Sequence, residues 1–297
     1  MNYIFIVNGR ADLAKRIDTA LTEQLRDLPI PYRIYHTTGV GDGTRYVKIY
    51  CDLHPKEEVC FVACGGSGTC NEVASGIVKE PNKRMAIFAA GTSNDFTKCF
   101  PDRDFHNIRK MLAGEEKIID IMQVNDNYAL NSCQMGFDSV VASEANYLSE
   151  LGKNNPYRRG VIRAILTSRF NRIRVVADGK RIGHNWMNLC TLNNGQYVGG
   201  EFRCAPLSKC DDGLIDLCHI RPMSLLRFLF TMPKYRKGEH VHPDQSAMRK
   251  ITYRQVRHIE VSSKKLISMC LDGELLPGTR FTVDILPQSI RLVLPAL

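Results

Sequence analysis

The sequence of 297 residues predicts an α/β domain with a parallel sheet, followed by a second domain that is mainly antiparallel. Residues 3–113 alternate short apolar runs with amphipathic ones, as expected where strands alternate with helices. After Asp120 the runs become strand-like and turn signals separate them, which is typical of antiparallel structure. The length also exceeds the size at which one hydrophobic core usually stops growing, so two domains are expected.

The elements of the first half follow from this alternation. Four strands are predicted at Tyr3–Val7, Tyr32–Thr37, Val59–Cys64 and Met85–Ala90, and three helices at Leu13–Leu28, Thr44–Leu53 and Cys70–Val78. The pattern changes near Ile121–Asn125, so we expect one domain over residues 1–122 and another over 123–297. Open α/β sheets bind ligands beyond the carboxyl ends of their strands, which is where functional residues are expected.

The second half contains eight strand-like runs and two helical ones. The predicted strands are Tyr128–Cys133, Ile173–Ala177, Met187–Leu192, Leu214–Ile220, His258–Ser262, Leu266–Leu271, Phe281–Leu286 and Ile290–Leu294. The helices are expected at Asp138–Leu151 and Ser224–Lys234. No internal repeat or low-complexity segment interrupts them.

Composition narrows the class of protein. With 44% hydrophobic and 24% charged residues, the chain belongs with folded proteins. No apolar run approaches the roughly 20 residues that cross a bilayer, and Met1–Val7 lacks the basic and apolar regions of a secretory signal. We therefore expect a cytoplasmic protein. Its eleven cysteines include no CxxC pair, which favours buried reduced thiols over a zinc site.

The formal net charge of +9 indicates attraction to polyanions such as nucleic acid, anionic lipid headgroups or phosphorylated ligands. The sequence has no basic motif interleaved with aromatic residues, which argues against nucleic acid. Nothing in it indicates an oligomeric state. Basic residues gather in one segment, which is either a docking patch or a solvated face. They are Arg158, Arg159, Arg163, Arg169, Arg172 and Arg174.

Two glycine-containing stretches follow predicted strands and open helix-like segments. They are Gly65-Gly66-Ser67-Gly68-Thr69 and Gly91-Thr92-Ser93-Asn94-Asp95. Backbone amides at such helix N-termini favour phosphate oxygens. A purely structural alternative is a capping box, formed by Thr69 with Glu72 and by Thr92 with Asp95. Neither stretch has the spacing of a Walker loop or of a dinucleotide fingerprint.

Acidic residues cluster at two places in the second half. The Asp-Gly pairs at Asp178, Asp212 and Asp272 each predict a hairpin turn. At the last pair, Glu274 follows directly, so two acids on one tight turn could supply a general base. A further group could hold a hard cation or simply form a solvated loop. It comprises Asp211, Asp212 and Asp216.

Taken together, these motifs resemble the diacylglycerol kinase catalytic-domain family, which includes the sphingosine kinases and, most similar to this chain, the bacterial lipid kinases of the YegS type. The similarity runs nearly end to end. The matching elements are Val7-Asn8-Gly9, Thr37 with Gly41-Asp42, the GGSGT stretch with Asn71-Glu72-Val73, Gly91–Phe96, Gly136-Phe137-Asp138, Gly199-Gly200 before Ala205-Pro206, Asp212-Gly213-Leu214 and Leu271-Asp272-Gly273-Glu274.

The resemblance implies a nucleotide-binding α/β domain, a β-sandwich-like lipid-binding domain that carries the catalytic acid, and an active site between them. It implies an ATP- and Mg²⁺-dependent kinase that phosphorylates a hydroxyl of a diacylglycerol-like or other membrane lipid at an anionic, inner membrane surface. Glu274 would be the general base, assisted by Asp272, and a structural magnesium would be held by Lys209, Asp212 and Leu214. The nucleotide-binding residues would be Asn8, Thr37, Cys64, Gly65, Gly66, Ser67, Gly68, Thr69, Cys70, Thr92, Asn94 and Asp95.

One departure from the family pattern concerns the metal. Ser67 stands where the family's GGDGT has a carboxylate, and a neutral hydroxyl does not replace an ionised magnesium partner. Asp42 or Asp95 could compensate. The alternatives are therefore a nucleotide- or lipid-binding homologue with weak or no catalysis, and a kinase for a soluble hydroxyl such as that of NAD. The acidic turn and the Gly91–Phe96 stretch argue against the NAD kinase alternative.

Overall fold

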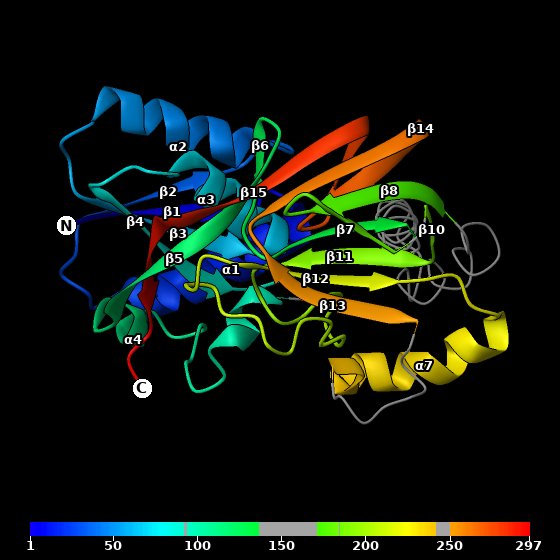
Figure 1. Cartoon of the computed structure of the whole chain (residues 1–297). Coiled ribbons are helices and arrows are strands. Elements are labelled where there is room, and N and C mark those ends of the chain that lie inside the picture. Colours follow the sequence, from blue (N-terminus) through cyan, green and yellow to red (C-terminus); the bar gives the residue numbers. More distant parts are fainter. Residues whose placement is uncertain (92–93, 137–170, 184, 242–249) are drawn as a thin grey trace. The chain divides into compact units, whose positions relative to one another are not determined.

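The structure is a computed structural model, which describes residues 1–91, 94–136, 171–183, 185–241 and 250–297 (Figure 1). The chain forms two compact units. Unit 1 comprises Met1–Ile121, Cys210–Gly213 and Leu286–Leu297, and unit 2 comprises Met122–Lys209 and Leu214–Ile285. Cys210–Gly213 and Leu286–Leu297 thus belong to the N-terminal unit, although the sequence pattern led us to expect a single boundary after residue 122.

Unit 1 is built on a parallel sheet, as predicted. Its strands are β1 (Asn2–Val7), β2 (Tyr32–His36), β3 (Val59–Gly65) and β4 (Lys83–Ala89), and they lie in the order β2-β1-β3-β4. The last part of β15 (Glu274–Leu294) pairs in parallel with β4. Because the chain order reverses between β1 and β3, the loops that follow these two strands flank the crevice where such sheets bind ligands.

Helices cover both faces of this sheet (Figure 1). They are α1 (Ala11–Leu25), α2 (Asp42–Leu53), α3 (Ser67–Gly76), the 3-10 helix η1 (Phe96–Cys99) and α4 (Ile108–Leu112). Side chains of α1 and α4 pack with alternate residues of β1 and β3, including Phe5 and Val62, in one apolar core. On α2, the ring of Tyr50 meets Phe61 edge-on at 5.7 Å. Each large side chain buried here contributes roughly 1.5–3 kcal/mol.

Unit 2 is mainly antiparallel, also as predicted. Here β7, β11, β12 and β13 are neighbours in that order, and β14 pairs with β7, β8 and β15. The elements are β5 (Glu115–Val124, which begins in unit 1), β6 (Asn127–Ala129), β7 (Ser132–Gly136), β8 (Asn171–Ala177), β9 (Lys180–Ile182), β10 (Trp186–Met187), β11 (Leu189–Asn193), β12 (Ile215–Ile220), α7 (Leu225–Lys237), η2 (Glu239–Val241), β13 (Ile251–Val256) and β14 (His258–Leu271).

Alternate residues of β11 and β12 pack into two different hydrophobic cores. Cys190 and Leu217 face a core shared with β7, β8, β14 and β15. Leu189 and Ile220 face a second core, where Phe228 and other residues of α7 pack on the sheet. This period of two is what a sheet covered on both faces requires.

Three predictions about the second half need correction or lie outside the described residues. The strand expected at Tyr128–Cys133 is interrupted at residues 130–131, because their amide groups bind a side chain instead of a neighbouring strand. Asp212-Gly213 joins no pair of strands, so the predicted hairpin there is wrong. The helix expected at Asp138–Leu151 lies outside the described residues, as do Arg158, Arg159, Arg163 and Arg169.

The other two Asp-Gly pairs form the predicted hairpins. Asp178-Gly179 joins β8 to β9, and Asp272-Gly273 joins β14 to β15, with positive φ at all four residues. All eleven cysteines are free thiols and ten are buried, as expected for small apolar residues. None of the described helices is long and apolar enough to span a bilayer.

Two buried histidines of unit 2 should make its free energy of unfolding depend on pH. His219 on β12 is fully buried, its ring nitrogens have no hydrogen-bond partner among the described residues, and Gly183 packs against the ring. His240 is 5% exposed, and its Nε2 lies 3.0 Å from the carbonyl oxygen of Cys204. Burial lowers the pKa of each histidine to about 4, since the charged imidazolium is poorly solvated there.

We therefore expect unit 2 to lose stability as the pH falls from about 6.5 toward 4. In this window the unfolded chain binds protons that the folded chain does not, so each histidine lowers the free energy of unfolding by about 1.4 kcal/mol per pH unit. Urea unfolding at pH 7 and pH 5 measures the loss. His219→Phe should reduce the pH dependence, whereas His106→Gln, at an exposed position, should not. An unchanged pH dependence in His219→Phe would contradict this assignment.

Candidate functional site

The loops that follow β1, β2 and β3 are bonded to one another at one edge of the unit 1 sheet. The Asn8 amide nitrogen donates to Thr69 Oγ1 over 3.1 Å, and the Gly9 N–H donates to Thr37 Oγ1 over 3.0 Å. The backbone N–H of Asn8 donates to the carbonyl of Cys64 over 3.0 Å. The predicted nucleotide-binding residues Asn8, Thr37 and Thr69 are thus brought together.

Two glycines join the loop after β3 to the loop after β4. A Cβ on Gly91 would lie 2.4 Å from the Cα of Gly66, a contact that real Cβ atoms do not make. The N–H groups of Ala90 and Gly91 both donate to the carbonyl of Gly65 over 3.0 Å. This close backbone approach explains why glycine is required at position 91, and it places both predicted phosphate-binding stretches side by side.

Helix α3 begins inside the first stretch, at Ser67, and its N-cap is Gly66, which offers no side chain to its amides. Such an N-terminus can receive an anion. Nearby, Asn94 Oδ1 is buried and has no hydrogen-bond partner among the described residues. A buried amide in this position needs a partner from a ligand or from water. The N-terminus of α3 fits a phosphate group, whereas Asn94 Oδ1 is an acceptor and needs a hydrogen-bond donor, such as a hydroxyl or amino group of the ligand or a water.

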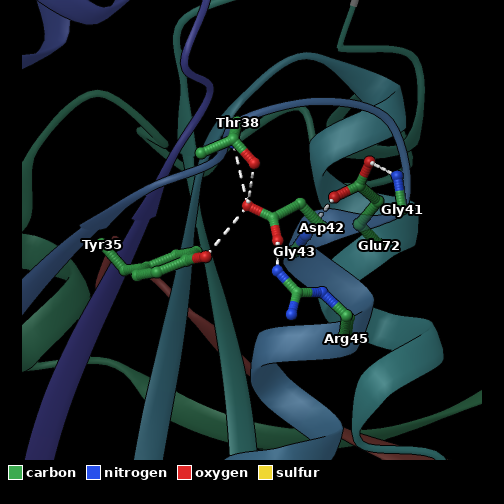
Figure 2. A network of polar contacts seen from close by, with 7 residues as sticks. All are labelled: Tyr35, Thr38, Gly41, Asp42, Gly43, Arg45 and Glu72. Atoms are coloured by element: carbon green, nitrogen blue, oxygen red, sulfur yellow. Dashed lines mark hydrogen bonds and ion pairs between the residues drawn. The ribbon is translucent and has the colours of Figure 1, made fainter.

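The capping-box interpretation of Thr69 and Glu72 is wrong. Thr69 is already inside α3, and the carboxylate of Glu72 turns away to the next helix, where it accepts the N–H groups of Gly41 and Gly43, each over 2.8 Å (Figure 2). Burial raises the pKa of Glu72, and the two amides oppose that shift. Glu72 therefore caps α2 and ties its N-terminus to the glycine stretch on α3.

Asp42, the first residue of α2, is buried at the centre of a polar network (Figure 2). Its Oδ2 accepts the backbone N–H of Thr38 over 2.8 Å and the hydroxyl of Tyr35 over 2.9 Å, and its Oδ1 accepts from Arg45 over 2.5 Å. The Thr38 N–H and the Arg45 guanidinium hold the pKa of Asp42 well below its usual range. These donors fix the loop between β2 and α2.

The remaining predicted nucleotide-binding residues differ in which of their groups could contact a ligand. The side chains of Cys64 and Cys70 are buried, so these residues could face a ligand only through their backbone. Asp95 is 5% exposed and pairs with Lys98 over 2.8 Å. Thr92 lies outside the described residues.

The glycine stretches are suited to bind phosphate. The side chains around them suit a metal ion less well. Mg²⁺ is usually held by one or two carboxylates together with phosphate oxygens and waters. Position 67 supplies a hydroxyl, and the two acids proposed to compensate, Asp42 and Asp95, are already paired with Arg45 and Lys98. Within unit 1 the carboxylate ligand that the resemblance implies is missing from the first glycine stretch.

The acidic turn of unit 2 divides its two acids between different environments. Asp272 is 6% exposed, and its carboxylate accepts the N–H groups of Leu130, Asn131 and Ser132 over 2.7, 3.0 and 2.9 Å. Three N–H donors suit an ionised carboxylate, which can only accept. Glu274 is partly exposed at the start of β15. Asp272 thus holds the turn, while Glu274 is accessible.

Sequence reasoning missed the residues that support this turn. The side-chain amide of Asn194 donates to the carbonyl of Leu130 over 2.9 Å, and that of Asn131 donates to the carbonyl of Tyr197 over 3.0 Å. Both asparagines are buried. The one available signal was Asn193-Asn194 at the end of a strand-like run, which resembles an ordinary turn.

The segment that contains the predicted magnesium ligands Lys209, Asp212 and Leu214 is held by Asp120. This buried carboxylate accepts the N–H of Gly213 over 2.7 Å and the N–H of Gln288 over 2.8 Å. The suggested cluster of Asp211, Asp212 and Asp216 does not form, because Asp211 pairs with Lys117 and Asp216 binds the Tyr253 hydroxyl. Among the described residues no group of three or more His, Cys, Asp or Glu side chains could hold a metal.

Comparison with known families and proteins agrees with the motif analysis. The family described as "Diacylglycerol kinase catalytic domain" matches residues 2–124, and "YegS C-terminal NAD kinase beta sandwich-like domain" matches residues 131–294. A "Probable lipid kinase YegS-like" of Yersinia enterocolitica is 28% identical over 98% of this chain and 96% of its own length. A diacylglycerol kinase of Bacillus subtilis is 29% identical over 82% of this chain and 80% of its own.

Among solved structures, a diacylglycerol kinase from Bacillus anthracis superposes with a TM-score of 0.67 at 19% identity. The superposition covers 99% of this chain and 96% of that one. At this identity the similarity establishes the fold alone. It agrees with an N-terminal α/β unit and a C-terminal unit that is mainly antiparallel and sandwich-like.

Proposed function

Because this chain belongs to the diacylglycerol kinase catalytic-domain family, in its YegS-like branch, we propose that it transfers the γ-phosphoryl group of ATP to a hydroxyl of a diacylglycerol-like membrane lipid. The observation that carries the proposal is the contact between Gly66 and Gly91, which joins two glycine stretches at the carboxyl edge of a parallel sheet. That edge is where α/β folds bind phosphorylated ligands.

The donor nucleotide would bind to unit 1. Amides at the start of α3 would receive phosphate oxygens, and a hydroxyl or amino group of the nucleotide would donate the hydrogen bond that Asn94 Oδ1 lacks among the described residues. The loop after β2, fixed by Asp42, would carry Thr37 toward the nucleotide. Phosphoryl transfer has a loose and strongly anionic transition state, so these groups contribute chiefly by alignment and by screening charge.

The acceptor hydroxyl would be deprotonated by Glu274 of unit 2. A general base must be accessible, and its backbone must be held in place; Glu274 is partly exposed, and the neighbouring Asp272 holds the turn through three backbone amides. We therefore assign Asp272 a positioning role: it orders the turn and does not itself accept the proton.

A magnesium ion bound with ATP would supply charge neutralisation between the phosphates. Its protein contact at position 67 would be a serine hydroxyl, with phosphate oxygens and water providing the other ligands. A second, structural magnesium would be held by the carbonyls of Lys209 and Leu214 with the carboxylate of Asp212. A membrane lipid as acceptor would bring the protein to the inner surface of the cytoplasmic membrane, and the net charge of +9 favours anionic lipid there.

The assignment of the base is tested with Glu274→Gln in an assay of labelled phosphate transfer from ATP to diacylglycerol. Loss of the base should lower kcat at least about 100-fold while ATP binding is retained. Glu260→Gln, which neutralises an exposed acid on β14, is the matched control and should keep wild-type turnover. Full kcat in Glu274→Gln, on every lipid that the wild-type protein accepts, would show that another group takes the proton.

Ser67 favours a second candidate function, a nucleotide- or lipid-binding protein that has lost catalysis. On the kinase proposal, the wild-type protein turns over lipid and Ser67→Asp raises kcat about tenfold or more, which corresponds to 1.4 kcal/mol of added transition-state stabilisation. Ser67→Ala, which removes the hydroxyl and adds no charge, should not raise kcat.

The acceptor panel should contain diacylglycerol, phosphatidylglycerol, ceramide, sphingosine, monoacylglycerol and NAD. Wild-type protein that binds ATP but phosphorylates none of them, with turnover appearing only in Ser67→Asp, would establish the second candidate. Turnover of NAD alone would identify a kinase of a soluble acceptor and contradict the lipid assignment.

A further inference from the structure

Within the described part of unit 2, helix α7 packs one of its faces against the sheet. Ser224 caps its first turn, and Gly238, in the left-handed conformation, ends it. Phe228 and Tyr235 are each 2% exposed and pack with residues of β11 and β12, while Thr231 lies on the same buried face. The helix is therefore firmly attached to the sheet, and its outer face is available for another role.

That outer face is apolar. Leu226, Leu229 and Phe230 are 68%, 49% and 73% exposed. Their spacing of three and four residues puts them on one stripe of a helix with 3.6 residues per turn, opposite the buried stripe. Exposed Pro233 extends the stripe by one turn. Three large apolar side chains in a contiguous exposed row mark an interaction surface, since isolated ones are ordinary but clusters are not.

Basic residues border this stripe. Arg227 and Lys234 lie on one side of it, Arg236 on the other and Lys237 at its C-terminal end, and the helix contains no acidic residue. Arg236 pairs with the exposed Glu201 over 2.6 Å, and both remain more than half exposed. An apolar stripe bordered by lysine and arginine is the arrangement of a helix that lies in the interface of an anionic bilayer.

We propose that α7 docks the protein on anionic phospholipid bilayers by inserting Leu226, Leu229 and Phe230 among the lipid chains while its basic residues contact the headgroups. The charge argues for lipid over a second copy of this chain, because two such helices brought together would repel each other. The inference deepens the proposed function and rests on it for the choice of a lipid surface. Figure 1 shows α7 beside β13, at the outside of unit 2.

Sedimentation with phosphatidylcholine vesicles that contain phosphatidylglycerol, in the absence of ATP, measures docking without turnover. Phe230→Asp should reduce the bound fraction at least about tenfold at an equal lipid concentration, and Arg236→Gln with Lys237→Gln should reduce binding only where the anionic lipid is present. Leu53→Asp is the matched control, since Leu53 is 71% exposed on α2 of unit 1, and it should bind like wild type.

A spectroscopic test uses Phe230→Trp in a protein whose only tryptophan is removed by Trp186→Phe. Insertion should shift the emission to shorter wavelength on addition of vesicles, and brominated lipid should quench it. Unaltered vesicle binding by Phe230→Asp, or emission unchanged by vesicles, would overturn the proposal. Dissociation of a wild-type dimer by Phe230→Asp in analytical ultracentrifugation, with no vesicle binding by either protein, would also overturn it and assign the face to self-association.

The docking proposal and the kinase proposal can fail separately. Phe230→Asp should still phosphorylate a short-chain diacylglycerol that is dispersed as monomers, because Phe230 takes no part in the proposed chemistry. If the wild-type protein binds vesicles but phosphorylates nothing, docking stands and the kinase assignment fails. If it phosphorylates monomeric lipid but does not bind vesicles, the reverse holds.

Discussion

The close approach of Gly66 and Gly91 is the constraint on which the proposed site depends. Their backbones approach so closely that a methyl group on Gly91 would lie 2.4 Å from the Gly66 Cα. Without this approach the loops after β3 and β4 could not share the carbonyl of Gly65, and the N-terminus of α3 would stand apart from the second stretch. The arrangement leaves the backbone amides at the start of α3 at one edge of the sheet, which is suited to an anionic ligand.

Several carboxylates of this protein bind backbone N–H groups and thereby hold loops in place. Glu72, Asp120 and Asp272 each accept two or more main-chain N–H groups, and in each case they join segments distant in sequence. Such charge-assisted bonds fix loops that the apolar core does not reach. The two acids proposed to compensate for Ser67 are also bound to other side chains. A metal at this site would therefore depend on phosphate oxygens and water for its other ligands.

Local patterns were sufficient to predict the layers of the fold and the glycine stretches. The spacing of apolar residues predicted the four parallel strands to within a few residues. The Asp-Gly turn signals predicted two of the three hairpins correctly. What failed depended on contacts distant in sequence: the strand at Tyr128–Cys133 is interrupted by Asp272, and Glu72 reaches α2 where a local capping box was one expectation. Asn194 and Asp120 were missed for the same reason, since a single buried polar residue carries no sequence signal of its partner.

The most direct measurement of the central claim is the affinity of Gly66→Ala for a non-hydrolysable ATP analogue, determined by calorimetry. The fold tolerates this methyl group, whose nearest neighbour would be the Gly91 Cα at 3.6 Å, so the urea midpoint should be unchanged. If the backbone at Gly66 contacts phosphate, affinity should fall tenfold or more, or at least about 1.4 kcal/mol. Gly39→Ala, with open space around its Cβ, should bind normally. Wild-type affinity in Gly66→Ala would contradict the phosphate site.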